Sequence, residues 1–358
     1  MSSEFHKLKV ADIRQEIADA VSIRFEVPSE LQQAFCFTPG QHLTIRSFID
    51  GTDVRRNYSI CASPGERELR VAIKRVAGGV FSNWANEMLA VGQELDVLPP
   101  HGSFTWTFEQ DREALYIGFA GGSGITPVLS LMKTALEQEP RSKFVLCYGN
   151  RSSQSIMFME EIANLKNRYL DRLVIQHFLE DEFGDFPLFN GRLDQPKMRD
   201  LLATFGDVTA FDAAFICGPG PMMNAVEAEL LTAGMEQGRI LTERFTADEL
   251  SEDQMNAMRE LEKQAEGRAI KVNIDGRRRT FNFSADRGSI LENARAEGIR
   301  APFACKAGVC ATCRAKVISG KVEMAKNFGL TDDEVTQGFV LTCQSVPLTD
   351  DVELDFDQ

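Results

Sequence analysis

Cys305-Lys-Ala-Gly-Val-Cys310-Ala-Thr-Cys313 forms a cysteine-rich stretch near the C-terminus, and a fourth cysteine, Cys343, follows at a distance. Thiolates separated by four residues and then by two, with a distant fourth, are typical ligands of a [2Fe-2S] cluster. The small residues between them let the backbone wrap the cluster and point amide groups at its sulfurs. The sequence therefore predicts an electron carrier, because such a cluster moves one electron at a time.

Zinc is the alternative metal for these four cysteines. Four-cysteine zinc sites usually contain two closely spaced pairs, whereas this chain has only one such pair, Cys310 and Cys313. The spacing therefore favours the cluster. Gly308 is expected to provide a positive φ or a close backbone approach. Three of the remaining cysteines are interpreted as small buried hydrophobic residues: Cys36, Cys61 and Cys147.

The composition limits the class of protein. A chain of 358 residues is long enough for two or three domains, and no apolar run approaches the roughly 20 residues that cross a bilayer. A net charge of -14 without a basic stripe argues against nucleic acid as a partner. Reduced thiols in the cluster motif predict a cytoplasmic protein without a membrane partner. A late run of acids either steers a basic partner or lies on a solvated strand edge: Asp350, Asp351, Glu353, Asp355 and Asp357.

The residues around the cysteines predict a small domain over 268–358. A strand at Ile270–Ile274, an Asp275-Gly276 turn and a second strand form a hairpin. Ser289 and Glu292 then form a capping box that opens a helix before the cysteine loop. This order resembles the plant-type ferredoxin fold, which implies an α+β β-grasp domain with the four cysteines as iron ligands.

Residues 1–110 show short runs of alternating polar and apolar residues separated by turn residues, which predict an antiparallel β-barrel with one helix, Ser82–Ala90. Arg56 suits a pyrophosphate, Tyr58 suits stacking on a flavin ring, and Ser59 suits a hydrogen bond to flavin N5. Gly79 and Ser82 open the helix, where backbone N–H groups favour phosphate. Taken alone, a tyrosine or an arginine on a strand more often has a structural role.

Residues 111–245 contain continuous apolar runs that alternate with amphipathic stretches, which predicts an α/β domain with a doubly wound parallel sheet. The expected strands are Ala114–Ala120, Phe144–Tyr148, Leu173–Leu179, Ala213–Cys217 and Ile240–Phe245. The expected helices are Pro127–Gln138, Ser155–Asn167, Pro196–Phe205 and Pro221–Ala233.

The first strand of this domain leads into a glycine-rich loop, in which Gly121, Gly122 and Gly124 allow the backbone to approach a pyrophosphate and Thr126 can cap the next helix. Cys217 and Gly218 end a later strand, at the edge of a parallel sheet where ligands bind. A buried strand-end cysteine without a function is the alternative interpretation of Cys217.

Arg151 follows the second strand of this domain, and no acidic residue stands there to hold a ribose 2′-hydroxyl. The arginine is therefore expected to meet the 2′-phosphate of NADPH, and a solvated loop cation with NADH as cofactor is the alternative. Phe245, at the end of the domain, either packs on the flavin or fills the core. Residues 246–267 predict a helical connector, with Ser251 and Gln254 as a capping box.

The flavin and nucleotide motifs together resemble the ferredoxin-NADP reductase superfamily. With the C-terminal ferredoxin they resemble the reductase components of multicomponent oxygenases, and RRNYSICAS, YGNRSSQSIMF and VELDFD are most similar to reductases that serve phenylacetyl-CoA ring epoxidation. The resemblance implies FAD bound by Arg56, Tyr58, Ser59, Gly79 and Ser82, and a nicotinamide cofactor beside Cys217. Ser59 and Cys217 are the implied catalytic residues.

The resemblance implies hydride transfer from NAD(P)H to flavin N5, followed by single-electron steps through the cluster to a di-iron oxygenase. Two alternatives remain at this point. One is a reductase that serves another aromatic-ring or steroid oxygenase, with FMN in place of FAD. The other is a redox module without catalytic activity.

Overall fold

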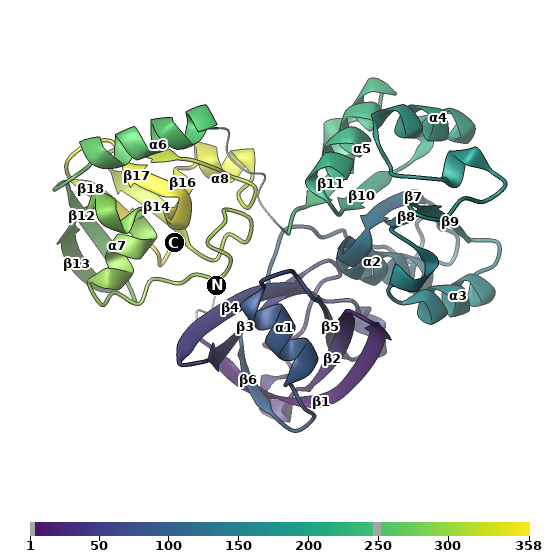
Figure 1. Ribbon diagram of the computed structural model, residues 1–358, viewed down its shortest axis with the longest axis horizontal. Coiled ribbons are helices and arrows are strands. Elements are labelled where there is room, and N and C mark those ends of the chain that lie inside the picture. The colour runs from purple at the N-terminus through teal and green to yellow at the C-terminus, as the bar shows by residue number, and fades with distance from the viewer. Residues whose placement is uncertain (1–3, 246–251) are drawn as a thin grey trace. The chain divides into compact units, whose positions relative to one another are not determined.

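The computed structural model describes residues 4–245 and 252–358, and Figure 1 shows their helices and strands. One compact unit ends at Phe245, and a second contains the described residues from Glu252 onward. Within these residues, no helix combines the length and the apolar character that crossing a bilayer requires.

The first part of the chain forms a six-stranded antiparallel sheet with the order β4-β3-β6-β1-β2-β5. Its strands are β1 (His6–Ile17), β2 (Ala20–Glu26), β3 (His42–Ile49), β4 (Thr52–Ser59), β5 (Leu69–Lys74) and β6 (Glu94–Val97). One α-helix, α1 (Val80–Glu87), packs against it. The helix begins two residues before the predicted start, because Gly79 serves as its N-cap.

The predicted antiparallel sheet is confirmed, but it does not close into a continuous barrel. The edge strands β4 and β5 meet only at an isolated bridge between Ile60 and Val71, and Cys61 N–H donates to the Arg70 carbonyl beside it. Pro64 then begins a 3-10 turn and offers no N–H for further pairing, so the ladder ends there.

The nucleotide part is a five-stranded parallel sheet with the order β11-β10-β7-β8-β9. The strands are β7 (Leu115–Gly121), β8 (Lys143–Asn150), β9 (Leu173–Leu179), β10 (Ala213–Cys217) and β11 (Ile240–Glu243), and the helices are α2 (Ile125–Gln138), α3 (Met159–Arg168), α4 (Gln195–Phe205) and α5 (Gly220–Thr232). Figure 1 shows α4 and α5 on one face of the sheet and α2 and α3 on the other.

Alternate strand residues explain this layering. Tyr116 and Phe215 belong to the core on the α2 and α3 side, whereas Phe119 and Ile216 belong to the core on the α4 and α5 side. Both faces of the central strands β7, β8 and β10 are therefore buried, as the continuous apolar runs predicted, whereas Val174 on the edge strand β9 is exposed. The doubly wound parallel sheet is confirmed.

Two local predictions in this domain were wrong. Thr126 does not cap α2: Gly124 is the N-cap, and the Thr126 hydroxyl donates to the Ser123 carbonyl at 3.0 Å from within the first turn. The helix expected from Ser155 begins at Met159, because residues 153–155 form a separate 3-10 turn and Phe158 has a φ of 58°.

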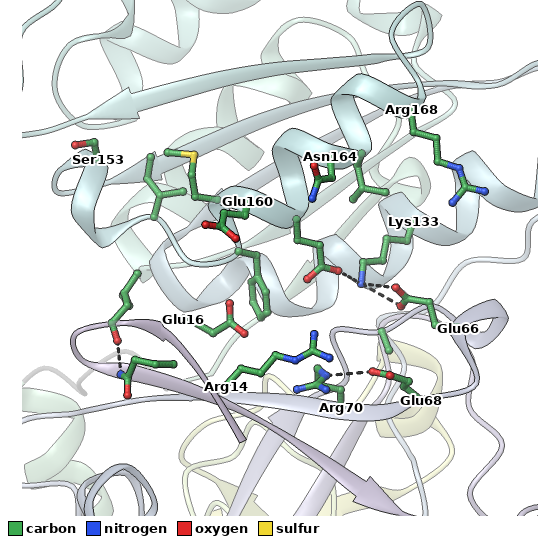
Figure 2. A pocket seen from close by; sticks show the side chains of 18 of the residues that line it. Arg14, Glu16, Glu66, Glu68, Arg70, Lys133, Ser153, Glu160, Asn164 and Arg168 are labelled. Atoms are coloured by element: carbon green, nitrogen blue, oxygen red, sulfur yellow. Dashed lines mark hydrogen bonds and ion pairs between the residues drawn. The ribbon is translucent and has the colours of Figure 1, made fainter. Parts of the chain in front are cut away.

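Lys133 joins the antiparallel sheet region to α2 and α3. Its ammonium donates to the Cys61 carbonyl at 3.2 Å and to Glu66 at 3.0 Å, and it also pairs with Glu161. Figure 2 shows Lys133 and Glu66 at the wall of a cleft of about 930 Å³. Burial acts to lower the pKa of Lys133, but Glu161 and Glu66 outweigh it, so that the pKa rises above its ordinary value.

Lys133→Met is therefore expected to destabilise the first unit by about 2 kcal/mol, because the carbonyl and both carboxylates lose a charged donor that methionine cannot replace. The carboxylates are more than one third exposed, which keeps the loss below that of a fully buried pair. The raised pKa means that the difference from wild type persists up to the ordinary lysine value of 10.5 and fades at higher pH. Urea unfolding measures it, with the exposed Lys143→Met as control; equal midpoints would contradict the prediction.

The C-terminal unit contains a five-stranded sheet with the order β13-β12-β18-β14-β16 and a separate β15-β17 pair. Its elements are α6 (Glu252–Gln264), β12 (Ala269–Ile274), β13 (Arg277–Asn282), α7 (Ile290–Ala296), β14 (Arg314–Ser319), β15 (Val322–Met324), α8 (Asp332–Thr336), β16 (Phe339–Leu341), β17 (Ser345–Pro347) and β18 (Val352–Asp355). The predicted hairpin is β12–β13, and Ser289 caps α7 by accepting from the Glu292 N–H.

Helix α6 lies where a connector helix was predicted, and its Met258 and Leu261 pack against the core of the C-terminal unit. Ser251, half of the expected capping box, lies outside the described residues. The acidic C-terminal strand, β18, is not a sheet edge but lies between β12 and β14. Asp357 just beyond it accepts hydrogen bonds from the N–H groups of Asp275 and Gly276, so it closes the hairpin turn.

Candidate redox site

The four predicted iron ligands lie in two pairs. Cys305 interacts with Cys310, and Cys313 interacts with Cys343. All four thiols are free of disulfides. No three His, Cys, Asp or Glu side chains converge on one metal position anywhere in residues 4–245 and 252–358. A four-cysteine zinc site needs four thiolates around one ion, whereas each iron of a [2Fe-2S] cluster takes two, so the paired arrangement fits the cluster.

The loop backbone is shaped for such a cluster. Lys306, Gly308 and Ala311 all have positive φ values, at 56°, 79° and 51°. A side chain at Gly308 would meet the Lys326 carbonyl at 3.1 Å, so both predicted reasons for this glycine hold. Ala307 N–H already points at the Cys305 sulfur at 3.3 Å. The loop thus presents backbone donors toward sulfur, which is the arrangement that stabilises a cluster.

The predicted flavin residues gather on β4 and α1. Tyr58 packs against Phe81 of α1 with ring centroids 5.6 Å apart, and burial raises the pKa of Tyr58. Arg56 is exposed at the surface of the same strand. Ser59, the residue that ends the strand directly after Tyr58, is buried. Arg56 and Tyr58 therefore lie on one face of β4, whereas Ser59 lies on the other face, where its hydroxyl donates to Glu243.

The N-terminus of α1 fits a phosphate. Its N-cap, Gly79, makes no side-chain cap hydrogen bond, so the first-turn N–H groups lack a capping side chain. The Ser82 hydroxyl accepts from the Val76 N–H at 3.1 Å and lies 3.4 Å from the Gly79 carbonyl. Ser82 therefore holds the turn with its side chain.

The glycine loop and the Cys217 segment lie against each other, because β7 and β10 are neighbours in the sheet. A Cβ at Gly124 would stand 2.1 Å from the Cys217 carbonyl oxygen, and one at Gly121 would stand 2.5 Å from the ring of Pro219. Only glycine permits these approaches. Cys217 is fully buried, and burial followed by the charge of Glu243 raises its pKa, so it stays a thiol.

Glu243 was not predicted from the sequence as a site residue, although its neighbour Phe245 was. Glu243 pairs with Cys217 across β10 and β11, and its carboxylate accepts from the Ser59 hydroxyl at 3.1 Å. Burial raises the pKa of Glu243 to about 8, against the opposing effects of Ser59 and His101. The sequence signal that could have identified Glu243 is its position at the carboxyl end of a parallel strand, where ligands bind. Ser59 and Cys217, which are far apart in the sequence, therefore both lie beside Glu243.

Phe245 is 39% exposed, so it does not fill the core. Its exposed ring stands two residues after Glu243, at the end of the last strand of the sheet. A position of this kind leaves an aromatic face available to a ligand.

A pocket of about 660 Å³ extends from the glycine loop to the end of β8. Gly121, Gly122 and the predicted Arg151 line it, together with Arg192, which was not predicted from the sequence. Asn150, also in the wall, is 5% exposed, and neither polar atom of its side chain has a hydrogen-bond partner. A buried amide without partners beside a glycine loop fits a polar ligand such as a dinucleotide.

Family models match three successive parts of the chain. An oxidoreductase FAD-binding domain matches residues 7–106, an oxidoreductase NAD-binding domain matches residues 119–228, and a 2Fe-2S iron-sulfur cluster binding domain matches residues 272–348. The sites described above lie within these segments or border on them. The cofactors are thus FAD, a nicotinamide dinucleotide and a [2Fe-2S] cluster.

Two relatives match over nearly the whole chain. The chain is 44% identical over 353 residues to one subunit of the 1,2-phenylacetyl-CoA epoxidase of Escherichia coli (strain K12), covering 99% of this chain and 98% of that protein. It is 35% identical to the ferredoxin reductase component of 3-ketosteroid-9-alpha-monooxygenase of Rhodococcus rhodochrous, covering 98% and 96%.

Phthalate dioxygenase reductase, a modular structure for electron transfer from pyridine nucleotides to [2Fe-2S], matches with a TM-score of 0.60 at 25% identity and covers 98% of both chains. The protein therefore belongs to the ferredoxin-NADP reductase-like family of oxygenase reductase components, with FAD-binding, NAD-binding and C-terminal [2Fe-2S] ferredoxin domains.

Proposed function

We propose that this protein passes electrons from NADPH through FAD and its [2Fe-2S] cluster to a di-iron oxygenase that epoxidises phenylacetyl-CoA in the cytoplasm. The observation that supports phenylacetyl-CoA as the substrate of the partner is the 44% identity, over nearly the full length of both chains, to one subunit of the 1,2-phenylacetyl-CoA epoxidase. The ketosteroid monooxygenase reductase component is 35% identical over a similar length, which keeps a steroid oxygenase as the second candidate partner.

The flavin would accept an electron pair from the nicotinamide and release it as single electrons to the cluster. The protein residues position these groups. Arg56 and the N-terminus of α1 at Gly79 supply positive potential for the flavin pyrophosphate. Tyr58 offers an aromatic face, and Ser59 offers a hydroxyl for the flavin N5 position. Phe245 supplies a second exposed ring.

In this proposal, backbone N–H groups and the charge of Arg151 bind the nicotinamide dinucleotide. Gly121, Gly122 and Gly124 bring main-chain N–H groups to the cofactor pyrophosphate, and Thr126 fixes the loop through the Ser123 carbonyl. Cys217 and the N–H of Gly218 would line the position where the nicotinamide ring meets the flavin. We assign the reactive positions to Ser59 and Cys217 and the iron ligands to Cys305, Cys310, Cys313 and Cys343.

The test of the partner is reconstitution. The purified protein is mixed with the phenylacetyl-CoA epoxidising oxygenase and, in parallel, with a ketosteroid 9-alpha-hydroxylating oxygenase. Consumption of NADPH that depends on phenylacetyl-CoA and is matched by epoxide formation is the expected result. Coupled turnover only with the steroid oxygenase would instead assign the second partner.

Arg151→Ala is expected to raise the KM for NADPH about tenfold and to leave the KM for NADH within about twofold, because the lost guanidinium would have met only the 2′-phosphate. Steady-state ferricyanide reduction measures both constants without involving the cluster. Arg239→Ala, outside the pocket, is the matched control. A tenfold preference of the wild type for NADH would remove Arg151 from the site.

A further inference from the structure

We propose that Gln344 is a positioning residue of the iron-sulfur site, whose side-chain amide donates to the sulfur of Cys343, ties the two ligand pairs together and raises the reduction potential of the cluster. The inference rests on the reductase function and the iron ligands proposed above and deepens them, because it assigns control of the electron affinity of the site to one side chain. The sequence indicated no role for this glutamine, which directly follows the fourth cysteine.

The Gln344 side chain lies between the cysteine loop and the distant fourth cysteine. Its Nε2 donates to the Lys306 carbonyl at 3.0 Å and to the Cys343 carbonyl at 3.0 Å, and it lies 3.7 Å from the Cys343 sulfur. Lys306 directly follows Cys305, which belongs to one ligand pair, whereas Cys343 belongs to the other. One amide group therefore links the segments that carry the two pairs.

The acceptors around Gln344 fix the direction in which its amide points. All three neighbours of Nε2 are acceptors, namely two carbonyl oxygens and a sulfur that is a thiolate when it binds iron. The amide oxygen in the same position would face both carbonyl oxygens without a hydrogen between them. The two hydrogens on Nε2 are therefore shared among the three acceptors, and removal of the amide takes this donor from all of them.

Gly308 makes room for the glutamine side chain. A Cβ at Gly308 would stand 3.0 Å from Cγ of Gln344 and 3.5 Å from its Cδ. The glutamine therefore lies directly against the backbone of the cysteine loop. Gly308 is buried, whereas Gln344 is half-buried. Contact with the glutamine is thus a further reason for glycine at this position, besides its positive φ and the nearby Lys326 carbonyl.

The backbone around Gln344 is held independently of its amide. The Gln344 carbonyl accepts from the Ala325 N–H at 2.9 Å, and the chain then continues into β17, which pairs with β15. Before the cysteine, the Thr342 hydroxyl donates to the Cys313 carbonyl at 2.9 Å. None of these contacts uses the amide, so the side chain can be replaced while Cys343 stays in place.

A hydrogen bond to a ligating sulfur changes the reduction potential of an iron-sulfur site. Reduction adds one negative charge, and an N–H group that donates to a thiolate stabilises the state with more negative charge. Ala307 supplies such a donor to Cys305 from the backbone at 3.3 Å, whereas Gln344 supplies one to Cys343 from a side chain. Gln344 therefore raises the reduction potential, and its donor, unlike that of Ala307, can be removed by a substitution.

The first test measures the reduction potential of the cluster in the full chain. Redox titration with mediator dyes, followed by the EPR signal of the reduced cluster, compares wild type with Gln344→Met, which has a similar length and no donor. The equilibrium constant for reduction is expected to fall about tenfold, which lowers the potential of this one-electron couple by about 59 mV. Gln337→Met is the matched control, because Gln337 is an exposed glutamine of the same unit. Equal potentials in wild type and Gln344→Met would overturn the proposal.

The second test uses Gln344→Lys, which also decides the question when the methionine variant does not retain iron. A lysine ammonium donates to the same acceptors and adds a positive charge, so the potential is expected to rise above that of wild type. A residue that only kept the loop in shape would not shift the potential in opposite directions in the two variants. A potential at or below the wild-type value in Gln344→Lys, with the cluster intact, would overturn the proposal. Wild-type protein without acid-labile sulfide would overturn the proposed iron ligands instead.

Discussion

Cys310→Ser is expected to lose reduction of cytochrome c and of the oxygenase by about 100-fold or more while it keeps NADPH-dependent reduction of ferricyanide. Cys310 interacts with Cys305, so its removal would take one of the two proposed thiolate ligands from one iron. Serine is a much harder donor and does not replace a soft thiolate on an iron-sulfur centre. Ferricyanide takes electrons from the flavin, so the first two domains alone support that activity.

The measurement combines three readouts on one preparation: acid-labile sulfide, cytochrome c reduction and ferricyanide reduction. Cys36→Ser is the matched control, because Cys36 is exposed and lies in the first sheet region. Retention of both activities in Cys310→Ser would mean that electrons leave the protein without passing through the cluster. Loss of both would mean that the C-terminal unit also supports the flavin site.

Much of the fold could be predicted because its patterns are local. The period-two runs of the first domain, the continuous runs of the second and the Asp275-Gly276 hairpin turn each depend on neighbours within a few residues. Barrel closure depends instead on how β4 and β5 approach each other, and only the bridge between Ile60 and Val71 joins them. The hydrophobic periodicity of a strand does not predict how close it comes to a distant strand.

Cys36 shows the limit of residue statistics. It was predicted to be buried, like Cys61 and Cys147, but it is exposed, and its thiol donates to the Gln32 carbonyl at 3.2 Å. The average preference of cysteine for the interior says nothing about a particular turn on the surface. The other two thiols are buried as predicted.

The candidate site could be predicted where its residues belong to one sequence motif. It could not be predicted where residues from distant segments come together. The cysteine loop carries three of the four proposed iron ligands within one turn region, and the glycine loop carries the proposed backbone donors to the dinucleotide. Ser59 and Glu243 are 184 positions apart, so their hydrogen bond follows only from the packing of one sheet on the other.

Gly124→Ala is expected to lower the rate of flavin reduction by NADPH about 100-fold, because the new Cβ would stand 2.1 Å from the Cys217 carbonyl oxygen. Neither backbone can yield easily: Gly124 is the N-cap of α2, and Cys217 is the last residue of a buried strand. The glycine loop and the nicotinamide segment must therefore move apart, which displaces the two surfaces that would hold the cofactor.

Stopped-flow reduction measures this effect, and reduction by dithionite shows whether the flavin and the cluster remain intact in the variant. Gly238→Ala is the matched control, since a Cβ there meets nothing within 4 Å. Unchanged reduction by NADPH in Gly124→Ala would show that this approach does not position the nicotinamide. Bound flavin at wild-type content together with slow reduction would locate the defect in hydride delivery, because the flavin residues Arg56, Tyr58 and Ser59 lie on β4 and α2 carries none of them.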